Sequence, residues 1–253
     1  MTCVVTLHHP GDLDEFRINA RKLLAADIPP GDVVWTGPEC ATLFADPLPY
    51  AEKTLSVPRS FVELADTVIC HRDDQRWPLL YEALWRLDHG EATLMQQQTD
   101  PLLHRLRRME NAVRHDRHRM TAFLRFRMVS DPDGEIYIAW YEPRHYSLRR
   151  TAAFFIDRFA SMRFSILTPD LSLCWDRSVA RYSPGLRKQD APPDDAIEQW
   201  WQRYYAAIFN PARVNPQLTR RHMPKDFWRH LPEAQAIPEL IANATARTDR
   251  MLR

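Results

Sequence analysis

Residues 119–142 read RMTAFLRFRMVSDPDGEIYIAWYE, and this stretch decides the fold. Its SDPDG segment predicts a tight turn, because proline presets φ and glycine accepts a positive φ. Successive side chains of a strand point to opposite faces, so residues 119–129 and 135–142 are predicted to form a two-faced β-hairpin. One face then carries Arg125 and Arg127, where an ordinary solvated strand would mix lysine, glutamate and threonine.

A second hairpin is predicted at residues 163–176, where RFSIL and LSLCWD flank a TPD turn. Between the hairpins, residues 147–162 have the apolar spacing of an amphipathic helix. The β-β-α-β-β order predicts an α+β fold, with an antiparallel sheet and a helix packed on one face. The face toward the helix is expected to hold Leu124, Phe126, Ile136, Ile138, Trp140, Phe164 and Ile166. The opposite face is expected to hold Arg125, Arg127, Tyr137, Tyr141 and Arg163.

Several helices and a small N-terminal β-α-β segment are predicted around this core. Strands at 4–7 and 33–35 flank a helix at 12–26, and a proline-rich loop follows at 36–57. Further helices are predicted at 58–70, 74–87, 100–118, 193–209 and 236–251. We predict an N-terminal α/β and helical segment at 1–99 and an α+β core domain at 100–253, with one continuous domain as the alternative.

Composition indicates a globular protein, with 45% hydrophobic and 26% charged residues, and the use of cysteine indicates a cytoplasmic one. No apolar run is long enough to cross a bilayer, and the N-terminus lacks the pattern of a signal peptide, so we expect no membrane partner. Cys3, Cys40, Cys70 and Cys174 are scattered and read as reduced thiols. We therefore expect neither a disulfide framework, a zinc site nor a cysteine-held iron–sulfur cluster, and no cofactor is predicted.

Positive charge is concentrated in one part of the chain, although the net charge is only +1. Residues 101–128 contain eight arginines but only two acidic residues, Glu110 and Asp116. One side of the predicted helix 100–118 is apolar, and the other is cationic. That cationic side would suit a nucleic-acid backbone, and the alternative is a solvated helix face. The cationic residues are His104, Arg105, Arg107, Arg108, Arg114, His115, Arg117 and His118.

Three groups of residues are candidates for chemistry. His115 and His118 are one helical turn apart and could share a metal, or instead cap the helix or contact phosphate. Glu142 and His145 leave a strand together, and a histidine that titrates near neutrality would suit acid–base chemistry. Their alternative roles are structural, with Glu142 paired to Arg125 or Arg127 and His145 capping the next helix.

The third group lies in the second hairpin, where Thr168, Asp170, Ser172 and Asp176 could bind a divalent cation. Asp170 is equally explained by turn formation after Pro169. The chain has no Walker loop, G-x-S-x-G elbow or G-x-G-x-x-G motif. A second basic segment, 209–228, is either a binding patch or an exposed loop.

Four stretches carry a family resemblance: RHDRHRMTAFLRFR at 114–127, AWYEPRH at 139–145, and the longer segments at 152–176 and 204–228. Together they resemble a bacterial family of DNA metabolism proteins, a domain of unknown function. That domain also occurs fused ahead of uracil-DNA-glycosylase-like domains and is encoded beside a DNA-repair radical-SAM protein. The resemblance implies a context in DNA repair or modification and no particular mechanism. Uracil excision is not expected of this chain, because it ends at Arg253 and leaves no room for a glycosylase domain. The chain has no radical-SAM cysteine motif either.

The matching positions are His118, Phe123, Arg125, Phe126, Trp140, Glu142, Pro143, His145, Phe155, Arg158, Phe159, Trp175 and Asp176. The family pattern implies tryptophan where Phe164 stands and glycine where Arg177 stands.

Our first hypothesis is a nucleic-acid-binding accessory factor that presents single-stranded or damaged DNA to a radical-SAM or uracil-DNA-glycosylase-like partner. Tyr137 or Tyr141 would stack on a base. The residues expected to bind nucleic acid are Arg114, Arg117, Arg125, Arg127, Tyr137, Tyr141, Arg158 and Arg163. The alternative is a hydrolase or glycosylase-like enzyme that acts on DNA or a nucleotide through His118, Glu142, His145 and Asp176. A third reading is a protein-binding module whose arginines pair internally.

Overall fold

The computed structural model describes residues 2–38, 55–131, 134–190, 231, 234 and 237–244. The chain divides into two compact units. The first unit comprises Met1–His118 and Pro143–Arg149, and the second comprises Arg119–Glu142 and Arg150–Arg253. The helix predicted at 193–209, the basic segment at 209–228 and Cys40 lie outside the described residues.

The first unit opens with the predicted β-α-β segment. Strands β1 (Cys3–Thr6) and β2 (Val33–Thr36) pair in parallel, and helix α1 (Leu13–Ala25) connects them. Asp12 starts the helix, because its carboxylate accepts the backbone N–H groups of the next turn at 2.9 and 3.2 Å. The β-α-β prediction is therefore confirmed.

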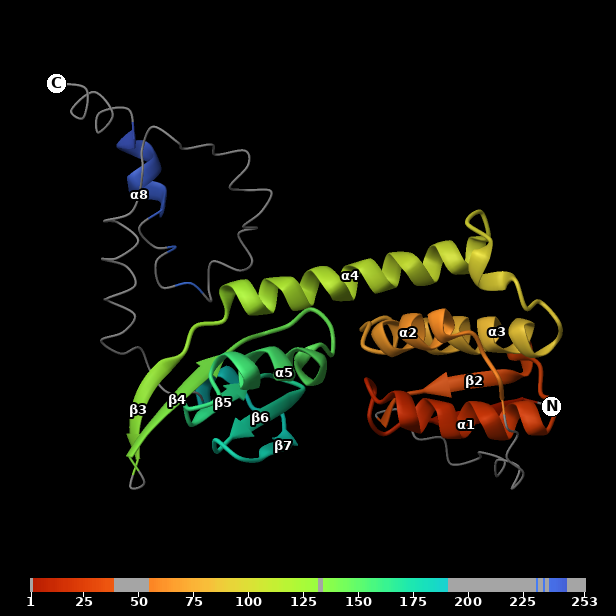
Figure 1. The fold of residues 1–253 in the computed structure, drawn as a ribbon, viewed down its shortest axis with the longest axis horizontal. Helices are drawn as coiled ribbons and strands as arrows, with labels where there is room; N and C mark the ends of the chain where they lie inside the picture. The colour runs from red at the N-terminus through yellow and green to blue at the C-terminus, as the bar shows by residue number, and fades with distance from the viewer. Residues whose placement is uncertain are drawn as a thin grey trace. The chain divides into compact units, whose positions relative to one another are not determined.

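Two further helices, α2 (Arg59–Val68) and α3 (Arg76–Asp88), run beside each other in the first unit (Figure 1). Trp35 of β2 joins these layers, since its ring lies 5.0 Å from the ring of Phe16 in α1 and 5.7 Å from that of Tyr81 in α3. The hydroxyl of Tyr81 donates to the carbonyl of Ile28 at 2.7 Å, so this buried tyrosine has its polar atom satisfied.

Helix α4 (Pro101–Phe123) has the apolar stripe that the sequence predicts, with Leu102, Leu106, Met109 and Val113 buried. It continues five residues past its predicted end, so the prediction of a strand from residue 119 was wrong. Met120 and Leu124 are buried four residues apart, and this spacing fits a helix as well as it fits alternation. Arg125 closes the helix by donating from Nη1 to the carbonyls of Ala122 and Leu124, at 2.8 and 3.2 Å.

The second unit contains a five-stranded sheet covered on one face by helix α5 (Leu148–Arg158), as Figure 1 shows. All neighbouring strands are antiparallel except β4 and β5, which α5 connects as a parallel crossover. The α+β class and the β-β-α-β-β core are confirmed, and a fifth strand that the sequence did not predict extends the sheet. The strands are β3 (Arg127–Asp131), β4 (Gly134–Trp140), β5 (Phe164–Leu167), β6 (Leu171–Trp175) and β7 (Ala180–Pro184).

The register of β4 differs from the prediction by one residue. Tyr137 pairs with Phe164 and Ala139 with Ile166, so these side chains share the face that α5 covers. Ile138 pairs with Arg127, which places both on the opposite face. Ile136, Ile138 and Trp140 were thus assigned to the wrong face, as were Tyr137 and Tyr141. A shift of one residue moves every side chain of a strand to the other face.

Shorter elements complete the described structure: 3₁₀ turns at Pro30–Asp32, Leu94–Gln96 and Lys188–Asp190, and helix α8 (Ile237–Ala242). In the second unit, Ile237 packs with Leu231 and Ala234, and half-buried Phe123 adjoins them. Among the described residues, we find no helix with both the length and the apolarity that a membrane span requires.

Candidate nucleic-acid interface

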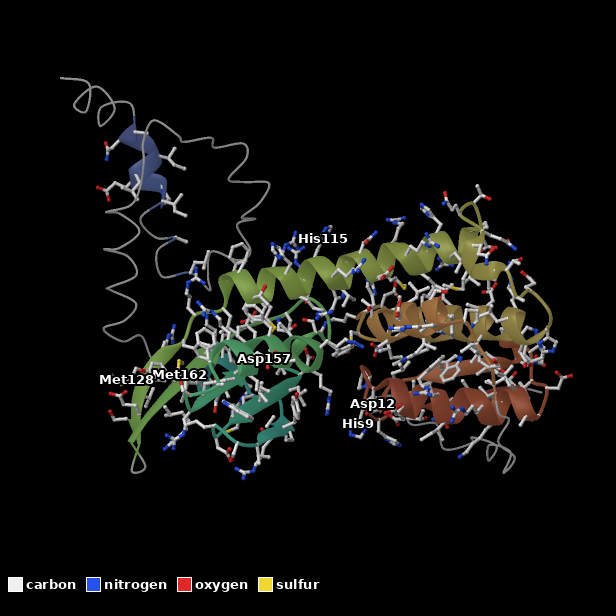
Figure 2. The ribbon with its side chains drawn as sticks, in the orientation of Figure 1. His9, Asp12, His115, Met128, Asp157 and Met162 are labelled. Carbon is white, nitrogen blue, oxygen red and sulfur yellow. The ribbon has the colours of Figure 1, made fainter. Side chains whose placement is uncertain are left out.

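The cationic side of α4 is exposed as predicted. Seven residues form it, and we call them the α4 cationic face: His104, Arg105, Arg107, Arg108, Arg114, His115 and His118. Figure 2 labels His115 on this helix. Arg107 donates to the carbonyl of Met95 at 3.2 Å, and Arg114 lies 3.7 Å from Glu110. Arg117, also predicted to bind phosphate, is half-buried.

Asp116 is turned away from the α4 cationic face and is only 1% exposed. Its carboxylate accepts the backbone N–H groups of Arg144 and His145, both at 3.1 Å. The hydroxyl of Ser147 donates to it at 2.9 Å. Asp116 therefore anchors the segment 143–149, and the exposed surface of the helix between residues 104 and 118 retains one acidic residue, half-buried Glu110.

The anchored segment holds His145 in a neutral state. Its Nδ1 accepts the backbone N–H of Arg72 at 3.2 Å, and its ring lies 4.3 Å from the ring of His71. Burial, followed by the nearby charges of His71, Arg72 and Arg144, lowers the pKa of His145 to about 4. His145 therefore does not titrate near neutrality as expected, and the proton affinity of its ring is too low for an effective general base at pH 7.

Sequence reasoning missed the fully buried Arg76 in the same unit. Its guanidinium donates to the carboxylate of Asp74 at 2.9 Å and to the carbonyl of Pro10 at 3.1 Å, and it lies 3.8 Å from the ring of Trp77. Burial lowers its pKa. Burial also disfavours the charged form of Cys70 and raises its pKa to about 12. This thiol therefore stays protonated and is not a nucleophile. In sequence, HRDDQRW looks like an ordinary solvated turn, and only its closing Trp77 indicates burial.

The four catalytic candidates are divided between the two units. His118 and His145 belong to the first, whereas Glu142 and Asp176 belong to the second. Glu142 accepts the indole N–H of Trp140 at 3.1 Å. Within the described ranges, no three histidine, cysteine, aspartate or glutamate side chains gather in a way that could hold a metal.

Asp176 organises the turn between β6 and β7. Its Oδ1 accepts the backbone N–H groups of Ser178 and Val179 and the Ser178 hydroxyl, at 2.7 to 3.0 Å. The hydroxyl bond, followed by the backbone bonds, lowers the pKa of Asp176 to about 2. Arg177 in this turn has a φ of +79°, a left-handed conformation that glycine adopts with less strain than a residue with a Cβ atom.

The predicted binding residues of the second unit have different surroundings. Tyr141 is 0% exposed, so its ring is not available to stack on a base, and that prediction was wrong. Arg125 caps α4, and Arg127 is half-buried in β3. Arg158 is exposed on the last turn of α5, and Arg163 is half-buried just before β5.

A pocket of about 390 Å³ lies in the second unit between α5, the end of α4 with the residues that follow it, and strand β4. Aromatic rings and two guanidinium groups line it, and Tyr137 is the tyrosine among them. The sequence placed Phe155 and Phe159 on the buried side of α5, but it gave no indication that their neighbours would enclose a cavity. The lining residues are Thr121, Leu124, Arg125, Phe126, Tyr137, Phe154, Phe155, Arg158, Phe159 and Met162.

One family model matches residues 74–233, which is more than half of the 253-residue chain. The chain belongs to the DUF4130 family. The family is described as a domain of unknown function, so the resemblance to such a domain is confirmed. The matched range contains α4, all five strands of the larger sheet and every pocket-lining residue. No curated protein and no solved structure matches the chain.

Proposed function

We propose that this DUF4130 protein binds single-stranded or damaged DNA and serves as an accessory factor for a repair or modification enzyme. The observation that supports this proposal is the α4 cationic face. It presents four exposed arginines, while the nearby carboxylate of Asp116 is buried and engaged by the segment 143–149. Arginines that project from one helix can replace the counterions of a phosphate backbone.

The family resemblance supports the choice of DNA and of the partner. It favours a bacterial cytoplasmic protein that works with a radical-SAM or uracil-DNA-glycosylase-like enzyme. The alternative, direct catalysis by His118, Glu142, His145 and Asp176, has less support. His145 is neutral and holds the backbone of Arg72, and Asp176 is engaged in a turn.

The test is the salt dependence of binding to a fluorescent single-stranded 20-mer, measured by anisotropy. Four arginine–phosphate contacts predict that affinity falls about 50-fold between 50 and 200 mM salt, because log K falls by about 0.7 per contact for each unit of log salt. Replacing two of these arginines, in the double variant Arg105→Gln/Arg108→Gln, should lower the slope of log K against log salt by about 1.4 in magnitude.

A matched control removes the same charge elsewhere. Arg17 and Arg59 are exposed on α1 and α2, where they pair with Asp14 and Glu63. The double variant Arg17→Gln/Arg59→Gln should leave the salt slope unchanged. Binding that does not respond to salt, or an equal loss in both double variants, would contradict the proposal.

A further inference from the structure

The phenylalanines of the pocket are arranged mainly by edge-to-face contacts. Phe126 is the hub, with its ring 6.2 Å from Phe155 at 88°, 5.4 Å from Phe159 at 79° and 5.3 Å from Phe164 at 59°. Phe154 meets Phe155 at 5.3 Å and 83°. Such contacts fix each ring, so the pocket wall is ordered before any ligand arrives.

The pocket also exposes aromatic surface that a folded domain would ordinarily bury. Phe154 is 48% exposed, whereas the adjacent Phe155 is 2% exposed. Phe126, Tyr137 and Phe159 are half-buried. Exposed aromatic surface gathered around one cavity is typical of a binding site, and 390 Å³ falls in the range of about 300–1,000 Å³ for small-ligand pockets.

The charge at the pocket is positive. Arg158 and Arg125 both line it, and no acidic side chain does so among the described residues. Arg125 uses Nη1 to close α4, whereas no hydrogen bond or ion pair engages Arg158 within the described part of the chain. Asp157, labelled in Figure 2, precedes Arg158 on α5 but does not line the pocket, whereas Met162, also labelled, does.

We propose that this pocket binds one unstacked nucleobase of DNA, against the exposed ring of Phe154, with Arg158 at the adjoining phosphate. The inference rests on the proposed function and names the part of the DNA that the second unit holds. An aromatic wall next to a guanidinium matches a base next to a phosphate better than it matches an uncharged apolar ligand.

This assignment also specifies which DNA is preferred. The wall offers few polar groups, so it holds the base by stacking and reads little of the sequence. Withdrawing a base from a duplex costs a few kcal/mol and costs least when the base is damaged, mismatched or already single-stranded. The pocket therefore selects single-stranded or damaged sites irrespective of base identity.

The experiment compares an eight-residue oligothymidylate with an eight-unit abasic oligomer of the same phosphate count, by anisotropy at one salt concentration. The wild-type protein should bind the base-bearing oligomer at least about fivefold more tightly, since stacking on an aromatic ring is worth about that factor or more. Phe154→Ala should remove most of this preference. Arg158→Lys should preserve the preference while slightly lowering the affinity for both oligomers.

The control is Val179→Ala, which trims a side chain of similar exposure (49%) in the same unit but outside the pocket. It should retain the full preference, and thermal unfolding of each variant confirms that the fold is kept. Equal, salt-dependent binding of both oligomers would overturn the base pocket and leave the proposed function intact. Absence of salt-dependent binding to either oligomer would overturn both. A Phe154-dependent affinity for decanoate without any base preference would show an acyl-chain pocket and also overturn the inference.

Discussion

The anchored segment 143–149 and the aromatic pocket contrast in how they use polar and apolar groups. At the anchor, the carboxylate of Asp116 is buried and accepts three hydrogen bonds from the segment. At the pocket, Phe154 stays half exposed and Arg158 is open to solvent. At the anchor, the polar groups already form hydrogen bonds within the fold. At the pocket, the ring of Phe154 and the guanidinium of Arg158 remain accessible to a ligand.

Arginine content alone does not distinguish these uses. Arg76 is fully buried and donates to Asp74 and Pro10, while Arg105 and Arg108 are exposed on α4. The first is a structural guanidinium, and only the others can meet a phosphate. Whether an arginine stabilises the fold or is available to bind a ligand therefore depends on its hydrogen-bond partners and its exposure, and not on residue type.

The largest expected effect comes from breaking the anchor. Asp116→Ala leaves two backbone N–H groups and the Ser147 hydroxyl without their acceptor. We expect the free energy of unfolding to fall by about 3–5 kcal/mol, measured by urea denaturation. Glu110→Ala, at the other acidic residue of the same helix segment, should change it by less than about 0.5 kcal/mol.

If Asp116→Ala does not fold, Asp116→Asn extends the test, because its single carbonyl oxygen keeps part of the acceptor capacity and should cost less. Equal losses for Asp116→Asn and Glu110→Ala would show that Asp116 does not anchor the segment.

Acid should weaken the same anchor without a mutation. Burial depresses the pKa of folded His145 to about 4, below its ordinary value of 6.5. Above pH 6.5 the ring is neutral in both states, and no stability difference arises. Between pH 6.5 and 4 the unfolded chain takes up the proton while the folded chain does not, so the free energy of unfolding falls. The lowered pKa of His71 acts in the same direction.

The measurement is urea unfolding at several pH values between 7 and 4.5. His145→Asn keeps an oxygen acceptor for the N–H of Arg72 and removes the titration, so its stability should fall less steeply than that of the wild type. His104→Asn, on the exposed α4 face, should follow the wild-type curve. Identical slopes for His145→Asn and the wild type would contradict the assignment.

The smallest expected effect comes from a substitution in the second unit that lies outside its pocket and should increase stability. Arg177 has a φ of +79°, which is unfavourable for a residue with a Cβ atom. Arg177→Gly should raise the free energy of unfolding by up to about 1 kcal/mol and the Tm by about 2–4 °C or less, measured by calorimetry. Arg177→Ala keeps the Cβ atom and should give no gain, and a gain equal to that of glycine would exclude backbone strain as the cause.

Much of the fold could be predicted because the decisive residues act locally. The antiparallel pairing of β3 with β4 and the apolar stripe of α4 depend on neighbours a few residues away, and both predictions were correct. The end of α4 was missed because Met120 and Leu124 satisfy two periodicities. Strand β7 was missed because ARYSP is polar and ends in Pro184, a composition that only an edge strand tolerates.

The site was less predictable because its contacts span long sequence separations. Exposure of the α4 arginines follows from helical spacing, and so does the inward position of Asp116, which lies three residues after buried Val113 and four before buried Met120. In contrast, the bond between Arg72 and His145 joins residues 73 positions apart. The pocket depends on the register of β4 in the sheet, which the sequence analysis predicted wrongly by one residue.

The chain path has a consequence for biosynthesis. The first unit ends at His118 but also requires Pro143–Arg149, so it is not one continuous stretch of polypeptide. On the ribosome, Asp116 emerges about 30 residues before Ser147, which is a delay of about 1.5–6 seconds at about 5–20 residues per second. During that interval the nascent chain holds the Asp116 carboxylate before its three hydrogen-bond donors in the segment 143–149 have been made. Chaperones that engage this protein cotranslationally would therefore be needed most in that interval.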